Sequence, residues 1–179
     1  KKLENLTYLF PGRKLIVIGV TGTDGKTTTV SLIYHILKES GKQTSMLTSI
    51  GAYIGKREYE TGFHVTTPNP FALQRLLRRS VQSGSKYFVL EVTSHALDQY
   101  RTWGIPFRIG VLTNITSEHL DYHKTFDNYL HAKEKLLEIS DIAIVNRDDG
   151  SYTLLSNSKK ATENKNWITY GFSESADIN

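Results

Sequence analysis

Residues 17–29, which read Val-Ile-Gly-Val-Thr-Gly-Thr-Asp-Gly-Lys-Thr-Thr-Thr, combine the residue types that bind phosphate. An apolar run leads into a glycine-rich loop, and a helical pattern begins at Thr27. The backbone N–H groups of such a loop and the positive end of the helix dipole make an anion site. Lys26 adds a charge for a β- or γ-phosphate, and the hydroxyl of Thr27 or Thr28 can ligate Mg²⁺. The stretch predicts a nucleotide phosphate loop, although Val20 replaces the first glycine of the strict G-x-x-x-x-G-K-[ST] pattern; the alternative is an ordinary strand-to-helix turn.

Glu91 follows four apolar residues, Tyr87-Phe88-Val89-Leu90, in the pattern of a second nucleotide-binding motif. Its carboxylate is expected beside the phosphate loop, where it would hold Mg²⁺ directly or through water. The alternative is a strand end that exposes Glu91 to solvent.

Three other places carry weaker signals when each is taken alone. The segment His119-Leu-Asp-Tyr-His123 is dense in ligand types, but a loop histidine is more often a hydrogen-bonding residue, and Mg²⁺ prefers oxygen. Lys133 lies among apolar helix positions, and this spacing favours a lysine that extends along an amphipathic face to solvent. Thr66 and Thr67 precede a proline and read as turn hydroxyls.

The elements that must position these residues are strands alternating with helices. Apolar runs predict strands at 15–20, 44–49, 87–90, 109–112, 142–145 and 167–170, and periodic or capped segments predict helices at 29–40, 71–83 and 127–139. A hairpin is expected at 53–59, turning at Gly55-Lys56. Gly41 should end the first helix, and Thr125 or Asp127 should cap the third.

This alternation predicts an α/β, P-loop-containing fold with an open, mostly parallel sheet flanked by helices. Ligands of such sheets bind beyond the carboxyl ends of the strands, where the phosphate loop, Glu91 and Asn114 all fall. We expect one domain over 14–179, a lead-in or linker over 1–13, and a polar, mobile segment over 156–166.

Composition sets broad limits on function. The 179 residues are 39% hydrophobic, which is enough for a real core. No apolar run reaches the ~18 residues of a membrane span, and the absence of cysteine favours a reducing compartment. The net charge of +4 is scattered rather than clustered, so anionic small substrates explain it as well as nucleic acid does.

Six stretches together resemble the central ATPase domain of the Mur ligases. In family order over about residues 15–150 they are 19–28, Thr66-Thr67-Pro68, 91–97, Thr113-Asn114, 119–123 and Ala132-Lys133. The motifs are most like those of the MurE type, which adds the third amino acid to the peptidoglycan stem peptide. Departures from the family pattern are Asp24, Thr93 and Glu118, where Asn, Ser and Asp are usual.

The resemblance implies a role for each matching residue, with Lys26, His119 and Lys133 as the catalytic group. ATP would be bound by Gly22, Thr23, Asp24, Gly25, Lys26, Thr27, Thr28 and Asn114. Two Mg²⁺ ions would be held by Thr27, Glu91, His119 and a carbamylated Lys133. The UDP-N-acetylmuramoyl-dipeptide substrate would be contacted by Thr66, Thr67, Thr93, Gln99 and Arg101.

The implied activity is an ATP-dependent ligation through an acyl phosphate, with the dipeptide and an amino acid as partners. We expect a cytoplasmic, monomeric protein without nucleic-acid or membrane partners. Family members also carry an N-terminal uridine-binding domain and a C-terminal amino-acid-binding domain, so the chain is expected to be a fragment, incomplete at its C-terminal end and inactive alone. The rival hypotheses are a folylpolyglutamate synthase-like or lipid II-amidating ligase, a P-loop kinase or NTPase, and a non-catalytic binding module.

Overall fold

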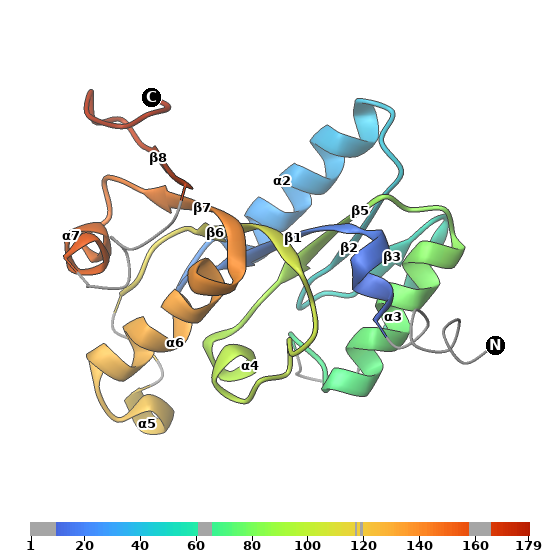
Figure 1. The fold of residues 1–179 in the computed structure, drawn as a ribbon, viewed down its shortest axis with the longest axis horizontal. Helices are drawn as coiled ribbons and strands as arrows, with labels where there is room; N and C mark the ends of the chain where they lie inside the picture. The colour runs from blue at the N-terminus through green and yellow to red at the C-terminus, as the bar shows by residue number, and fades with distance from the viewer. Residues whose placement is uncertain (1–9, 61–65, 117, 119, 158–165) are drawn as a thin grey trace.

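The computed structural model describes residues 10–60, 66–116, 118, 120–157 and 166–179 (Figure 1). The strands are β1 (Ile16–Thr21), β2 (Thr44–Leu47), β3 (Ala52–Ile54), β4 (Arg57–Tyr59), β5 (Tyr87–Glu91), β6 (Phe107–Leu112), β7 (Ser140–Asn146) and β8 (Asn166–Tyr170). The helices are the 3₁₀ turn η1 (Pro11–Lys14), α2 (Lys26–Glu39), α3 (Pro70–Gln82), α4 (Ser94–Asp98), α5 (Leu120–His123), α6 (Phe126–Ile139) and α7 (Ser151–Ser156).

The described strands form one eight-stranded sheet in the order β4-β3-β2-β5-β1-β6-β7-β8. Every pair from β2 to β8 across this order is parallel, and only the β2–β3 and β3–β4 pairs are antiparallel. The predicted open, mostly parallel sheet and the hairpin at 53–59 are therefore confirmed. The central position of β1 puts the phosphate loop between β5, which ends at Glu91, and β6, which is followed by Asn114.

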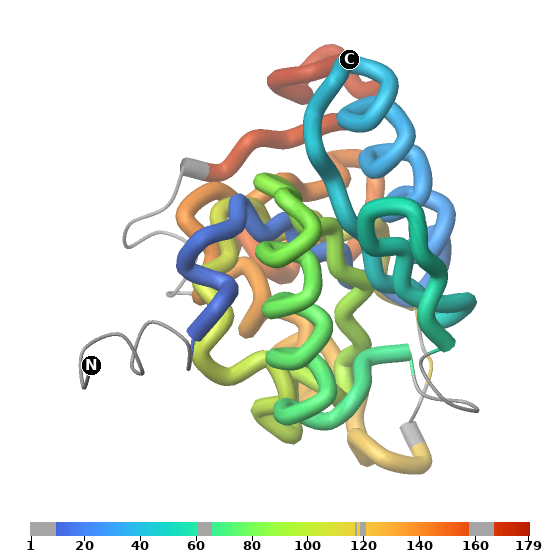
Figure 2. Tube along the Cα trace, turned by 90° about the vertical axis from the view of Figure 1, so that its right-hand side faces the viewer, coloured from blue at the N-terminus to red at the C-terminus, as the bar shows by residue number. Residues whose placement is uncertain are grey.

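Helices cover both faces of the sheet (Figure 1). Val30 and Tyr34 of α2 pack on one face in a cluster with Ile18 and Val89. Helices α3, α4 and α6 pack on the other face, and η1 lies beside α3 (Figure 2). The burial of apolar side chains on both faces explains why the strands read as continuous apolar runs instead of alternating patterns.

Local sequence signals set the ends of the long helices. The side chain of Asn69 accepts a hydrogen bond from Ala72 N at 3.0 Å and caps α3, and Thr125 accepts from Asn128 N at 3.2 Å and caps α6. Thr125, and not Asp127, is thus the cap of α6. Gly41 follows α2 with a φ of 77°, as expected for a residue just past a helix end.

The three short helices α4, α5 and α7 were not predicted. Each has four to six residues, which is too few for a helical period to appear in the sequence. The expected mobile segment overlaps residues 158–165, which lie outside the described residues, as do residues 1–9 of the expected lead-in. None of the described helices is both long and apolar enough to cross a bilayer.

Candidate nucleotide and metal site

The loop between β1 and α2 has a shape that depends on two glycines. Gly22 has a φ of 152°, and a Cβ atom on it would lie 1.9 Å from Thr113 Oγ1. Gly25 has a left-handed φ of 74° and is the residue from which α2 starts. The loop therefore packs tightly against the end of β6 and then turns directly into the helix.

Hydrogen bonds from the segment after β6 hold this loop and decide which of its amides can bind an anion. Thr23 N donates to Asn114 O at 2.9 Å, and Asp24 N donates to Asn114 Oδ1 at 2.9 Å. These two N–H groups are thus committed within the protein. The N–H groups of residues 26–28, in the first turn of α2, have no partner inside the helix and are the ones that can bind phosphate.

The Lys26 ammonium lies over the loop, where Nζ donates to Thr23 O at 2.6 Å. This bond keeps its charge next to the free amides of the first helical turn. A phosphate at the helix start would therefore meet both the helix dipole and a full positive charge.

Glu91 is buried beside Thr27, so the alternative of a solvent-exposed strand end is wrong. The residue is 2% exposed, and its Oε2 accepts hydrogen bonds from Thr27 Oγ1 and from Ser49 N, both at 2.9 Å. Among the described residues no lysine or arginine forms an ion pair with it. A buried carboxylate next to a hydroxyl, without a cationic partner, fits the oxygen ligands that Mg²⁺ prefers.

Lys133 is buried on α6, so the alternative of a lysine that reaches solvent is also wrong. It is 2% exposed, its Nζ donates to Gly22 O at 2.6 Å, and the ammonium lies 4.4 Å from the centre of the Tyr129 ring. Burial first, and the nearby Lys26 charge second, lower the pKa of Lys133 to about 7. A lysine in this state has a neutral, nucleophilic amine in part of its population at neutral pH, which is what carbamylation by CO₂ requires.

The predicted substrate residues lie one loop away and are bonded to one another. Thr67 is 1% exposed, donates from Oγ1 to Glu91 O at 3.0 Å and accepts from Thr93 N at 3.2 Å. Arg101 Nη1 donates to Thr67 O at 2.9 Å, and Arg101 Nε and Nη2 donate to Gln99 Oε1 at 2.9 and 2.6 Å. The structure thus brings Thr67, Thr93, Gln99 and Arg101 together. The Thr67 hydroxyl, however, is hydrogen-bonded to backbone atoms of the protein itself.

His119 lies outside the described residues, so its predicted role as a metal ligand stays a prediction. Its neighbour His123 is 5% exposed and its Nε2 lies 3.0 Å from Ser94 Oγ, at the start of α4. His123, at the end of α5, is therefore held against the start of α4.

Two residues that contact the site were missed in the sequence. Ser49 follows β2, and its Oγ lies 3.2 Å from Thr27 Oγ1; its place after a strand was the available signal. Tyr129 lies one turn before Lys133, and its hydroxyl is 3.1 Å from Thr23 Oγ1. Its place one helical turn before Lys133 was the only sequence hint of its role.

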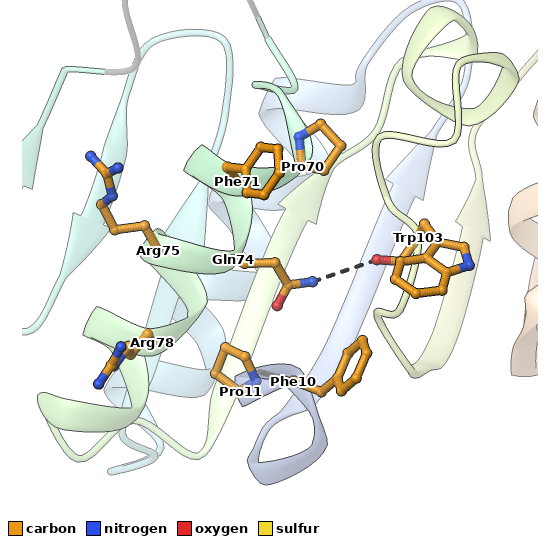
Figure 3. A pocket seen from close by; sticks show the side chains of 8 residues that line it. All are labelled: Phe10, Pro11, Pro70, Phe71, Gln74, Arg75, Arg78 and Trp103. Carbon is orange, nitrogen blue, oxygen red and sulfur yellow. Dashed lines mark hydrogen bonds between the residues drawn. The ribbon is translucent and has the colours of Figure 1, made fainter. Parts of the chain in front are cut away.

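An apolar hollow of about 430 Å³ lies elsewhere, between α3, η1 and the loop after α4 (Figure 3). Phe10, Phe71 and Trp103 line it, together with Arg75 and Arg78. It includes neither the phosphate loop nor Glu91, so we do not assign the nucleotide to it.

Comparisons with known proteins agree with this geometry. A family model described as the Mur ligase middle domain matches residues 20–179. Relatives called UDP-N-acetylmuramoyl-L-alanyl-D-glutamate–2,6-diaminopimelate ligase occur in Parabacteroides distasonis (40% identity over 174 residues, 96% of this chain and 35% of the relative) and Clostridium perfringens (45% over 139 residues, 78% and 28%). The chain spans about a third of the length of these curated relatives.

Solved structures show the same fold. The structure of an enzyme with the same name matches with a TM-score of 0.78 and 29% identity, covering 91% of this chain and 33% of that chain. A MurF structure from Acinetobacter baumannii matches with a TM-score of 0.67 at 20% identity, covering 94% and 34%. The second likeness concerns the fold alone.

Proposed function

The chain belongs to the Mur ligase family, and from this premise we propose that it is the ATP- and metal-binding part of a ligase that adds the third amino acid to UDP-N-acetylmuramoyl-dipeptide. The relatives are named for 2,6-diaminopimelate, which is therefore the first amino acid to test. Because the chain matches about a third of these relatives, the activity is proposed for the longer protein of which this chain would be the middle part.

The observation that carries this proposal is the meeting of three functional side chains at the ends of β1 and β5 and on α6. Lys26 and the amides of the first turn of α2 offer positive charge for phosphate, and Glu91 offers a buried carboxylate for Mg²⁺. Lys133 comes from the opposite side and is bonded to Gly22 of the same loop. A plain phosphate loop needs Lys26 and Glu91 but gives no role to a buried lysine at this place.

The proposed reaction has two steps. The terminal carboxylate of the dipeptide attacks the γ-phosphorus of ATP, the bond to the bridging oxygen breaks, and ADP leaves with the electron pair. The amine of the incoming amino acid then attacks the acyl phosphate, loses a proton and displaces inorganic phosphate. The first step brings two anions together, so Lys26 and the helix amides act by holding the phosphates and offsetting their charge.

The metal ligands proposed from the chain itself are Thr27 and Glu91, with His119 from the segment outside the described residues. Bound Mg²⁺ supplies charge neutralisation and a fixed orientation for the phosphate oxygens. A second ion would be held by Lys133 once CO₂ has converted its amine to a carbamate, an anionic oxygen donor. With ¹³C-labelled bicarbonate we expect a ~45 Da gain in mass, located on Lys133, that the Lys133→Met variant lacks.

The remaining roles follow from the same premise. Gly22, Thr23, Asp24, Gly25, Thr28 and Asn114 are proposed to shape or line the ATP site, and Thr66, Thr67, Thr93, Gln99 and Arg101 the side that faces the muramyl dipeptide. Use of ATP implies a cytoplasmic reaction, and we expect a monomer.

The deciding experiment measures phosphate release from ATP by the full-length protein with and without the muramyl dipeptide and diaminopimelate. We expect release to require both co-substrates and to yield the tripeptide product. Lys26→Ala should abolish release while the protein stays folded. Release that is independent of the dipeptide would favour the kinase or NTPase hypothesis, and release that depends on a folate or on lipid II would favour the other ligases.

A further inference from the structure

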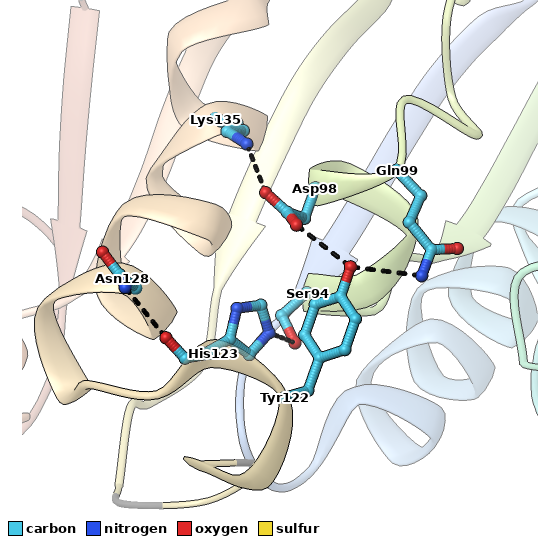
Figure 4. Close-up of polar contacts among 7 residues, drawn as sticks. All are labelled: Ser94, Asp98, Gln99, Tyr122, His123, Asn128 and Lys135. Carbon is cyan, nitrogen blue, oxygen red and sulfur yellow. Dashed lines mark hydrogen bonds and ion pairs between the residues drawn. The ribbon is translucent and has the colours of Figure 1, made fainter.

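A network of polar contacts links α6, α5 and the C-terminal end of α4 (Figure 4). Lys135 Nζ donates to Asp98 Oδ1 at 2.8 Å, and the Tyr122 hydroxyl donates to Asp98 Oδ2 at 3.1 Å. Gln99 Nε2 donates to the Tyr122 oxygen at 3.2 Å. None of these contacts explains phosphate or metal binding, and the proposed function leaves Tyr122 without a role.

The charge of Asp98 sets the direction of each hydrogen bond in this network. The hydrogen bond from Lys135 holds the pKa of Asp98 below its usual range, although burial opposes this, and Tyr122 lowers it further. An ionised carboxylate can only accept, so the Tyr122 proton points at Asp98. The lone pairs of the Tyr122 oxygen then remain for a donor on the other side.

This polarity sets the orientation of the Gln99 side chain. Its NH₂ group faces the Tyr122 oxygen, so its carbonyl oxygen must face the other way, where it accepts two hydrogen bonds from Arg101. If the amide turned over, its NH₂ group would face the guanidinium and both bonds would be lost. Tyr122 and Arg101 therefore favour the same orientation of the amide, and Tyr122 holds its NH₂ end in place.

The guanidinium of Arg101 keeps N–H groups that can bind an anion. A guanidinium has five N–H groups. Gln99 Oε1 accepts from Nε and from one N–H of Nη2, and Thr67 O accepts from one N–H of Nη1. One N–H remains on each terminal nitrogen, and an oxygen of a carboxylate or phosphate can accept a charge-assisted hydrogen bond from either one.

Hydrogen bonds on both sides connect Arg101 to the rest of the site. Thr67 binds Arg101 through its carbonyl and Glu91 O through its hydroxyl, and Lys135 lies two residues after Lys133 on α6. Arg101 is therefore tied at one end to the strand that carries Glu91 and at the other, through Tyr122, to the helix that carries Lys133.

We propose that Tyr122 is a positioning residue which, through the Gln99 amide, holds the Arg101 guanidinium ready for a carboxylate or phosphate of the muramyl substrate. The inference rests on the proposed function for the identity of that substrate. Tyr122 itself does not touch the reacting atoms, so its loss should weaken binding of one substrate and leave the ATP site unchanged.

The first test compares Tyr122→Phe with Tyr100→Phe in the full-length protein. Tyr122→Phe deletes only the hydroxyl, and we expect the KM for the muramyl dipeptide to rise about tenfold, with kcat, the KM for ATP and Tm unchanged. Tyr100 is a neighbouring tyrosine, 68% exposed, whose hydroxyl makes no hydrogen bond within the described part of the chain, so its variant should match the wild type.

The second test asks whether the effect passes through Gln99. In a Gln99→Glu background both side-chain oxygens can accept from Arg101, so there is no amide orientation left for Tyr122 to fix. We expect Tyr122→Phe to change the KM for the dipeptide less than twofold in that background, although Gln99→Glu alone alters binding.

A third measurement needs only the 179-residue chain and no substrate. In a ¹⁵N-edited spectrum the Arg101 Nε–H should be protected from exchange with water in the wild type and in Tyr100→Phe, and should lose protection at least tenfold in Tyr122→Phe. The exchange measurement tests the positioning by Tyr122 separately from the identity of the substrate. If the full-length protein does not use the dipeptide but Arg101 Nε–H is protected as expected, the proposed substrate is wrong and the positioning by Tyr122 is supported. An unchanged dipeptide KM in Tyr122→Phe, a rise in both KM values with a lower Tm, or an unaltered Arg101 signal would overturn the inference.

Discussion

Two ionisable side chains, Glu91 and Lys133, are buried at the same end of the sheet and reach it from different elements. Each is 2% exposed. Burial of a charge without a matching partner costs free energy, so a chain selected for stability alone would not place both there. We infer that the two residues are kept for binding, and each makes a prediction about stability.

The buried amine of Lys133 should make stability depend on pH. Its pKa is about 7 in the folded chain, against 10.5 for the ordinary group, so between these values the unfolded chain binds a proton that the folded chain does not. The free energy of unfolding should therefore rise with pH from about 7 to 10. Lys133→Met should be more stable than the wild type by about 1–3 kcal/mol at pH 6.5, with the difference shrinking toward pH 10.

This prediction is checked by urea denaturation in CO₂-free buffers, so that no carbamate forms. Lys42→Met, a change of an exposed lysine, serves as the control and should follow the wild type. Parallel pH profiles for wild type and Lys133→Met would show that Lys133 titrates normally.

The carboxylate of Glu91 should account for stabilisation by metal-bound nucleotide. Mg²⁺ and ATP at about 100 times their dissociation constant should raise the Tm of the wild-type chain by about 5–10 °C. Glu91→Gln keeps an oxygen for Ser49 N but removes the charge, so it should lose more than half of this shift. Without ligand it should be at least as stable as the wild type, because no charge is then buried.

Differential scanning fluorimetry with and without Mg²⁺·ATP measures this effect. Glu39→Gln, at the exposed end of α2, is the matched control and should keep the full shift. A Glu91→Gln variant with an undiminished shift would place the metal elsewhere.

At the scale of elements, the phosphate loop owes its shape to β6 as much as to its own glycines. Thr113 Oγ1 donates to Asp24 O at 2.7 Å, and Asn114 Nδ2 donates to the same oxygen at 3.2 Å. The segment after β6 thus fixes the loop before any ligand binds. A rigid loop offers its anion site without an ordering cost at the moment of binding.

Gly22→Ala tests this packing. The added Cβ would lie 1.9 Å from Thr113 Oγ1 on a residue with a φ of 152°, so we expect a loss of about 3 kcal/mol or more in the free energy of unfolding. Gly150→Ala is the control, since its Cβ would meet nothing within 4 Å and its φ of −58° suits any residue. Chemical denaturation of both variants should separate them clearly, and equal stabilities would mean that the loop can move away from β6.

At the scale of the whole molecule, the residues assigned to ATP address its phosphates and metal. We therefore expect the 179-residue chain alone to bind Mg²⁺·ATP and Mg²⁺·GTP with affinities within about threefold, as for other sites that read only phosphate. It should form no tripeptide product from either nucleotide, because the relatives are about three times as long. Calorimetric titration measures the affinities, and a tenfold preference for ATP would reveal a base-binding surface within this chain.

The sequence by itself determined the kind of fold and the order of the functional residues. Apolar runs before Gly22, Glu91 and Asn114 were sufficient to predict parallel strands, because strands buried on both faces leave that pattern. Because ligands bind beyond the carboxyl ends of parallel strands, the same pattern predicts that these residues lie close together.

Only the tertiary structure decided what surrounds each residue. Periodicity suggested that Lys133 reaches solvent, because its position on α6 does not reveal that Gly22 O and Tyr129 enclose its ammonium. The network through Tyr122 was invisible for the same reason, since it joins side chains from three different elements. Burial and long-range hydrogen bonds arise from packing between elements, and a linear pattern records only the preferences within each one.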